Sequence, residues 1–157
     1  MSHWIEQRVE QTKRREEAEQ KEREWQIHCA QVIGARWKEV IEEFEKTVRA
    51  DVDLWNATYT DNPRKLIDGV FKNVPNGFKL HKSYYPSFDL YLVFDSQSQL
   101  ILYEFVKNKG MDLGSAKGKG QFRLQLAEDG NIYLLHSGKP VSFEEASRLL
   151  LEPLLIS

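Results

Sequence analysis

The stretch of sequence that decides the fold is FDLYLVFDSQSQLILYEF, residues 88–105. Apolar and polar side chains alternate on each side of a short polar turn, and a period of two is typical of strands with one buried face. A turn centred on Gln97 and Ser98 forms a hairpin in which six apolar side chains share one face. The predicted pairs are Phe94 with Ile101, Leu92 with Tyr103, and Leu90 with Phe105.

The same alternation outside this hairpin predicts a five-stranded antiparallel sheet. Asp129-Gly130 is a strong signal for a second, two-residue hairpin turn. That turn predicts that Leu126 faces Tyr133, that Leu124 faces Leu135, and that Arg123 lies directly beside His136. The five strands are expected at residues 78–85, 88–95, 99–107, 121–127 and 131–136.

An apolar stripe at residues 25–55 predicts a long helix before the sheet. A continuous helix from Ser2 to about Trp55 measures roughly 80 Å at ~1.5 Å per residue. A domain of this size has a radius of gyration of only about 15 Å, so the start of the helix must project, fold back or break, with Gly34 as the expected kink. The stripe recurs at three- and four-residue intervals and consists of Trp25, Cys29, Val32, Ile33, Trp37, Val40, Ile41, Phe44, Val48, Val52 and Trp55.

Residues 1–24 are expected to form a charged, solvated helical extension. Residues 6–24 include six basic and seven acidic side chains, so this segment has no apolar face to bury. Pairs such as Glu10 with Arg14 have the i,i+4 spacing that supports an isolated helix. Residues 25–157 are expected to form a single α+β domain.

Two further helices are predicted around the sheet. Ser142 and Glu145 form a capping-box pattern that opens a C-terminal helix. A helix-start signal at residues 61–63 precedes a short apolar face made by Leu66, Ile67, Val70 and Phe71. The predicted fold class is therefore α+β, with a long N-terminal helix, a short second helix, a five-stranded antiparallel sheet and a C-terminal helix.

Charge and cysteine content narrow the classes of function. The 22 basic and 24 acidic residues nearly cancel, so no global field draws the chain to nucleic acid or to an anionic membrane. Cys29 is the only cysteine, which excludes an internal disulfide and a multi-thiolate metal site. Residues 1–13 lack the apolar stretch of a signal peptide, and no apolar run has the length of a membrane span. We therefore expect a cytoplasmic protein without membrane contact.

Catalytic chemistry finds little support in the residue pattern. The four histidines, at positions 3, 28, 81 and 136, lack the spacing typical of metal ligands. We recognise neither paired carboxylates nor a nucleophile with its base, so no catalytic residue, metal or cofactor is predicted. Cys29 lies on the apolar stripe and is interpreted as a small buried hydrophobe.

A basic, glycine-rich connection at residues 107–120 is the first candidate binding site. Its glycine spacing does not match a phosphate-binding P-loop, but lysines and backbone amides on a loop can hold an anion. The alternative, which the composition favours, is a flexible solubilising loop. Nucleic acid is an unlikely ligand because the loop lacks an aromatic side chain for base stacking. The candidate anion-binding residues are Lys109, Lys117, Lys119, Arg123 and His136.

An apolar patch on the second sheet face is the candidate partner interface, because exposed aliphatic clusters are usually covered. It comprises Val93, Leu102, Ile132 and Leu134. The leading hypothesis is a non-enzymatic interaction or assembly protein whose projecting N-terminal helix contacts another copy or a partner subunit. The alternatives are a binding module for an anionic ligand and an enzyme of unrecognised type.

Overall fold

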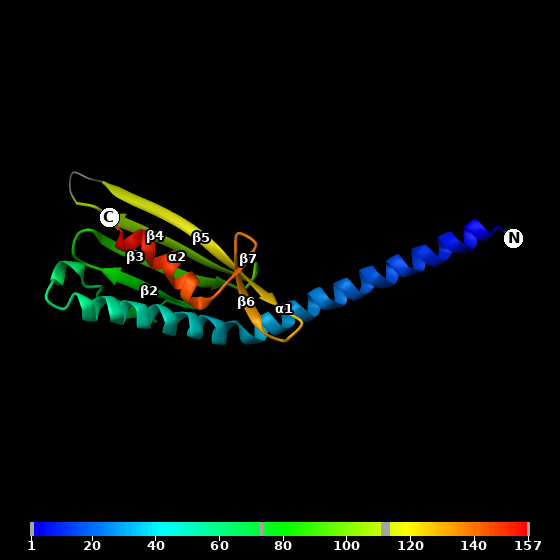
Figure 1. Cartoon of the computed structure of the whole chain (residues 1–157), viewed down its shortest axis with the longest axis horizontal. Helices are drawn as coiled ribbons and strands as arrows, with labels where there is room; N and C mark the ends of the chain where they lie inside the picture. The colour runs from blue at the N-terminus through cyan, green and yellow to red at the C-terminus, as the bar shows by residue number, and fades with distance from the viewer. Residues whose placement is uncertain (1, 73, 111–113, 157) are drawn as a thin grey trace.

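The computed structural model describes residues 2–72, 74–110 and 114–156. A long helix α1 (His3–Thr58) is followed by a short 3-10 helix η1 (Pro63–Lys65), an antiparallel sheet and a closing helix α2 (Phe143–Leu155) (Figure 1). The described strands are β1 (Gly69–Phe71), β2 (Gly77–Lys82), β3 (Ser87–Asp95), β4 (Leu100–Asn108), β5 (Ser115–Leu126), β6 (Ile132–His136) and β7 (Lys139–Val141).

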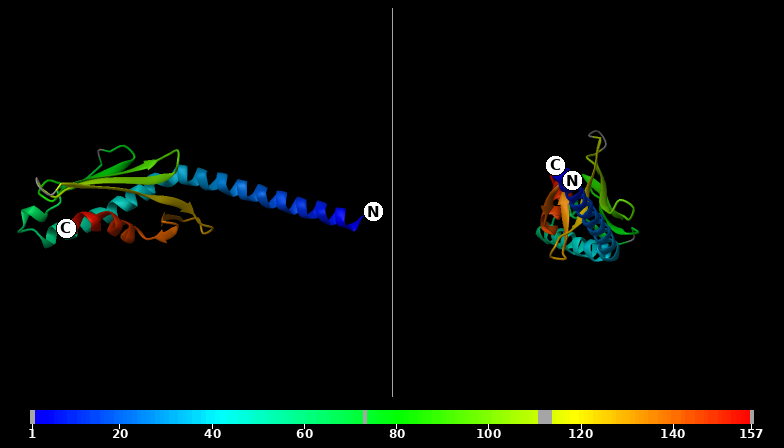
Figure 2. Two further views of the ribbon diagram at one scale, coloured as in Figure 1. Left: turned by 90° about the horizontal axis from the view of Figure 1, so that it is seen from above. Right: turned by 90° about the vertical axis from the view of Figure 1, so that its right-hand side faces the viewer.

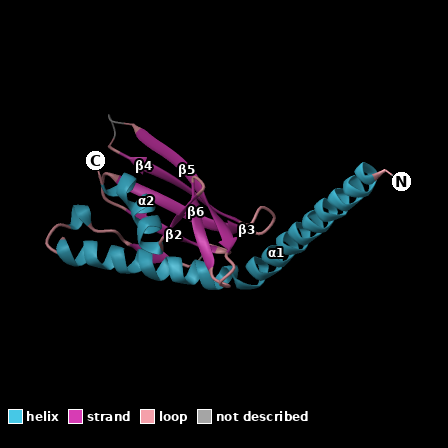
Figure 3. Ribbon diagram, turned by 45° about the vertical axis from the view of Figure 1, so that its right-hand side comes forward, coloured by secondary structure: helices cyan, strands magenta, loops and turns pink. Residues whose placement is uncertain are grey.

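The sheet is a meander in which each strand pairs with the next one along the chain. The order is β1 to β7 without a crossover, and every pairing is antiparallel. The sheet curls, and the second half of α1 lies with α2 against its inner face (Figures 2 and 3). Side chains from both helices and from the inner face of the sheet therefore make one core.

The first hairpin has the register that the alternation predicts. Phe94 lies opposite Ile101, Leu92 opposite Tyr103, and Leu90 opposite Phe105. Leu90, Leu92 and Ile101 are fully buried. The match follows from the period of two, because a slip by one residue would expose this apolar set.

The expected five strands and short second helix are wrong. The described part of the sheet has seven strands, because segments too short to show alternation pair at both edges. Of the apolar residues assigned to the second helix, Leu66 and Ile67 follow η1 outside any helix or strand, and Val70 and Phe71 lie in β1, which pairs with β2. Side chains from the end of α1 hold this segment extended: Trp55 Nε1 donates to the Lys65 carbonyl at 2.7 Å. At the other edge β7, which contains Pro140, pairs with β6.

The predicted register of the second hairpin is also wrong. The Ala127 amide donates to the Asn131 carbonyl at 2.9 Å, so three residues, not two, form the turn. Gly130 has a φ of 83°, as expected for the left-handed position of a three-residue hairpin. The longer turn shifts the register by one residue, so Leu126 faces Ile132, Leu124 faces Leu134, and Arg123 faces Leu135.

Helix α1 buries side chains in the core from Ile33 onward. Ile33, Val40, Ile41, Phe44, Val48 and Val52 are buried. Trp37 is half-buried and stacks on Phe94 with 4.7 Å between ring centroids, whereas Trp25 stays exposed. The helix runs through Gly34 without interruption, and its axis changes direction where it leaves the sheet (Figure 1).

The predicted N-cap of the C-terminal helix is confirmed. The Ser142 hydroxyl accepts a hydrogen bond from the Glu145 amide at 3.1 Å, which satisfies one of the free amides in the first turn. The buried Ser147 hydroxyl then ties α2 to α1 by donating to Asp51 at 2.6 Å. No helix in the described ranges is long and apolar enough to cross a membrane.

Phe44→Ala is expected to lower the free energy of unfolding by about 3–5 kcal/mol, because a large side chain leaves a cavity that the core cannot fill. Phe44 is fully buried and contacts Phe78, Phe122 and Phe143 edge-on or tilted. Urea unfolding of the variant measures the loss. Trp37→Ala is the comparison: its half-exposed ring should cost less, and an equal or larger loss would contradict this placement of the core.

Candidate functional site

The structure does not bring the five predicted anion-binding residues together. Lys117, Lys119 and Arg123 alternate along the exposed face of β5, and Lys109 follows β4. His136 lies on the inner side, with its ring 5.6 Å from that of Phe122. Arg123 and His136 therefore point to opposite faces of the sheet, as the corrected register requires. Residues 111–113 of the predicted loop lie outside the described residues.

The glycines of that segment have a packing role that the sequence analysis missed. Strand β5 begins at Ser115, so Gly118 and Gly120 are strand residues opposite Phe105 and Tyr103. A Cβ at Gly118 would lie 2.4 Å from the Phe105 ring, and one at Gly120 would lie 2.3 Å from the Tyr103 hydroxyl oxygen. The two rings therefore cover the glycine backbone, an arrangement that stabilises glycines in strands. The alternation of lysine with glycine at residues 117–120 was the available signal.

Gly118→Val is expected to destabilise the protein by about 1–3 kcal/mol, because the added side chain displaces the Phe105 ring. Lys117→Val is the matched control, since it introduces the same side chain one residue away on the exposed face. Thermal and urea unfolding of both variants measure the difference. If the two substitutions cost the same, Phe105 does not depend on the glycine.

The predicted partner patch is divided between the two faces of the sheet. Val93 and Leu102 are directly paired across β3 and β4 and are half-buried on the outer face. Ile132 packs against the core and Leu134 is buried within it. The four residues therefore do not form one surface.

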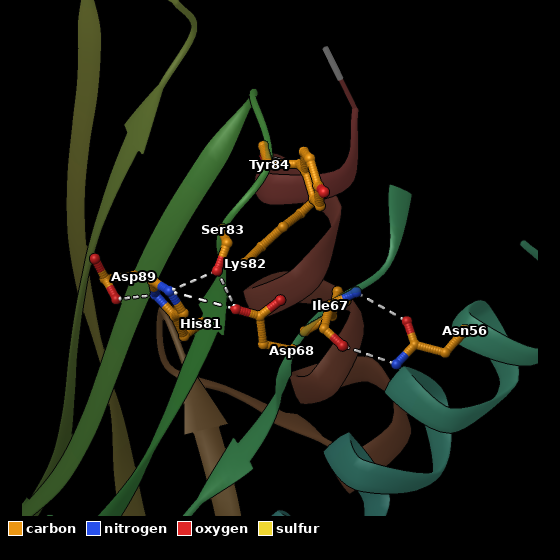
Figure 4. Close-up of polar contacts among 8 residues, drawn as sticks. All are labelled: Asn56, Ile67, Asp68, His81, Lys82, Ser83, Tyr84 and Asp89. Atoms are coloured by element: carbon orange, nitrogen blue, oxygen red, sulfur yellow. Dashed lines mark hydrogen bonds and ion pairs between the residues drawn. The ribbon is translucent and has the colours of Figure 1, made fainter. Parts of the chain in front are cut away.

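A polar chain of four side chains ties β1, β2 and β3 together (Figure 4). Its position depends on Asn56 of α1, whose amide group both donates to and accepts from the backbone of Ile67 at 2.9 Å. This clamp places the next residue, Asp68, beside Ser83, which donates a hydrogen bond to it. His81 lies between Ser83, at 3.2 Å from Nε2, and Asp89, at 2.7 Å from Nδ1.

Serine, histidine and aspartate are also the residue types of a serine nucleophile with its base. The hydrogen bond of the serine hydroxyl differs from that arrangement. In that chemistry the serine hydroxyl donates to the histidine. Here the Ser83 hydroxyl donates to Asp68. His81 also lies 3.4 Å from Asp68 through Nε2 and 2.7 Å from Asp89 through Nδ1, so the four side chains connect the end of β2 to β3 and to the residue before β1. His81 and Ser83, two residues apart, were the sequence signal for a shared face.

Two lysines point into the core, which the sequence analysis also missed. Lys82 donates to the carbonyls of Tyr84 and Pro86 at 2.8 and 3.0 Å. Lys107 donates to the carbonyls of Pro153 and Ile156 at 3.2 and 2.7 Å, at the end of α2. Burial lowers the pKa of both ammonium groups, and repulsion from Lys107 lowers the pKa of Lys82 further.

A lysine with a lowered folded-state pKa binds fewer protons in the folded than in the unfolded chain as pH rises toward the unfolded value of about 10.5. The free energy of unfolding should therefore increase with pH in the range between the lowered folded-state pKa of Lys82 and its unfolded-state value. Lys82→Met should remove that part of the pH dependence. Lys79→Met, on the outer face of the same strand, should retain it, and unfolding free energies between pH 7 and 10.5 measure both. Parallel curves for wild type and Lys82→Met would contradict the assignment.

The first half of α1 is a surface that the rest of the described chain does not cover. Residues 3–28 are exposed apart from the half-buried Thr12. Large apolar side chains stand out from this charged rod. They are Trp4, exposed by 69%, with Ile5, Val9, Trp25 and Ile27.

A groove lies where this exposed helix meets the sheet. It has a volume of about 590 Å³ and is bounded by α1, the turn between β3 and β4, and the end of β5. Gln99 fixes the turn against the helix, since its side-chain amide donates to the Ala30 carbonyl at 2.9 Å. Cys29 lines the groove and is half-buried, so it is not the fully buried hydrophobe that its place on the stripe predicted.

No protein-family model matches the chain, and neither a curated protein nor a solved structure compared with it matches. Within the described residues, no three acidic, histidine or cysteine side chains are grouped so that they could hold a metal ion. The geometry of the chain itself therefore carries the functional argument.

Proposed function

We propose that this is a non-enzymatic assembly protein that contacts other protein chains through residues 3–28 of α1. The observation that carries the proposal is the exposure of this helical segment. At ~1.5 Å per residue its 26 residues span about 39 Å. The left view of Figure 2 shows the segment extending away from the sheet.

The composition of the exposed segment supports a contact surface. Most of its charged side chains solvate the helix, and Arg14 pairs with Glu10 at 2.9 Å. Trp4 and Trp25 stand among them, and tryptophan is enriched at protein interfaces and in their energetic centres. A segment whose only role was solubility would gain nothing from exposed tryptophans.

The polar chain around His81 supports a structural role better than a catalytic one. Its serine donates to Asp68 and not to the histidine, and its members join three neighbouring strands. The alternative of an anion-binding module has less support than the sequence suggested, because His136 faces the opposite side of the sheet from the basic residues of β5. We also propose a cytoplasmic location, supported by the free thiol of Cys29, which suits a reducing compartment.

Site-specific photo-crosslinking tests the proposal. A photoreactive residue at Gln7 or Gln20, both exposed on the projecting segment, should give covalent adducts with protein chains in the cells that make the protein. The same residue at Asp61, exposed just beyond the other end of α1, is the control and should give few. Adducts of any composition at the helix positions support assembly, and equal yields at all three positions would refute it.

A further inference from the structure

The two halves of the projecting segment carry opposite charge. Residues 3–15 have four basic and two acidic side chains, a net charge of +2, whereas residues 16–28 have two basic and five acidic side chains, a net charge of −3. The helix dipole does not explain this order, because its effect falls off within the first turn, which carries the favourable Glu6. The order does suit a partner with the reverse order of charges.

We propose that the partner is a second copy of this chain, with the two projecting segments packed antiparallel. The inference rests on the proposed function and adds the identity and orientation of the partner. An antiparallel pair sets each basic half against the other copy's acidic half. A parallel pair would set like charges side by side, which is destabilising across an interface.

The groove at the base of the segment identifies the face that makes the contact. Glu22, Trp25 and Cys29 of α1 line it. Steps of seven residues remain on nearly the same helix face, so the face continues toward the tip. Its two series are Trp4, Gln11, Ala18 and Trp25, and Arg8, Arg15, Glu22 and Cys29.

The length of the segment sets the register of the pair. The helix is exposed up to about residue 30, where it begins to pack on the sheet. Two antiparallel segments can therefore overlap until His3 of one copy lies beside residue 30 of the other. Trp4 of each copy then lies opposite Cys29 of the other, and Arg8 opposite Trp25. Arg8 and Arg15 also lie within about one helical turn of Glu22 of the other copy.

This register places Trp4 at the groove of the other copy. Trp4 is the most exposed tryptophan. The groove of about 590 Å³ has a mainly polar lining that includes Gln99 and Arg123, with apolar side chains such as Leu126 among them, and this mixture suits an indole ring with its N–H group. A tryptophan that fills a pocket at each end of an interface is a typical anchor. The middle of the interface holds the small Ala18, which lets the helices approach.

Disulfide mapping tests the orientation. In a Cys29→Ala background, Gln11→Cys and Glu22→Cys introduce two thiols on the contact face that lie opposite each other in the antiparallel register. Mild oxidation of the full chain should give mainly disulfides between position 11 of one copy and position 22 of the other, with a mass of twice the chain, and either cysteine substitution alone should give none. Disulfides that join like positions only would overturn the antiparallel arrangement.

Substitutions measure the contacts, with sedimentation equilibrium as the readout. Trp4→Ala should weaken the dimer by about tenfold or more if this anchor fills the groove. Ile27→Ala is the control. It removes an exposed apolar side chain on the side of the helix opposite the proposed contact face, so it should leave the dimer unchanged. Arg8→Glu with Arg15→Glu should weaken self-association, as should Glu22→Arg, and an equimolar mixture of the two variants should restore a dimer.

A mass equal to one chain at all concentrations would overturn this inference. The photo-crosslinking above then separates the two levels of the argument. Adducts at Gln7 or Gln20 with a different protein would leave the assembly function standing and refute the second copy as partner, and equal yields at the control position would refute both.

Discussion

The sheet can cover only as much of α1 as its strands are long, and the rest of the molecule follows from that limit. The longest strand, β5, has 12 residues, or about 40 Å at ~3.3 Å per residue. Helix α1 has 56 residues, or about 84 Å. The buried stripe from Ile33 to Val52, about 30 Å long, fits within the length of β5, and α2 covers the inner face beside it. The first half of α1 is left without a partner within the described chain.

The parts of the fold that sequence predicts well are those with a repeating pattern and a determined turn. The hairpin of β3 and β4 has both, since four alternating apolar residues on one strand meet three on the next. The second hairpin has the alternating pattern, but its turn length is not determined by the sequence. Asp129-Gly130 suits both a two-residue and a three-residue turn, and the turn length decides which face of the sheet Leu134 lies on. The strand β1 has neither, because its extended shape comes from contacts that Trp55 and Asn56 make from α1.

The candidate sites follow the same division. The exposed charged helix can be predicted from the sequence because its many charged residues and i,i+4 pairs lie within one continuous segment. The glycine-rich segment is ambiguous, since glycine suits both a mobile loop and a strand covered by aromatic rings, and only the pairing with Phe105 and Tyr103 decides between them. The polar chain of Asp68, His81, Ser83 and Asp89 joins residues from three segments. Its members become neighbours only through the register of the sheet.

The meander order of the sheet also governs how the molecule is built in time. Each strand pairs with the one before it, so contacts form between segments close in sequence, a topology associated with fast folding. Synthesis proceeds from the N-terminus, and domains tend to fold as they emerge. The stripe of α1 is synthesised before the sheet that buries it. Helix α2, which contacts the rest of the core through Ser147 and Lys107, is synthesised after the sheet. A nascent chain of this protein therefore carries the apolar stripe of α1 uncovered until the strands that bury it have been synthesised.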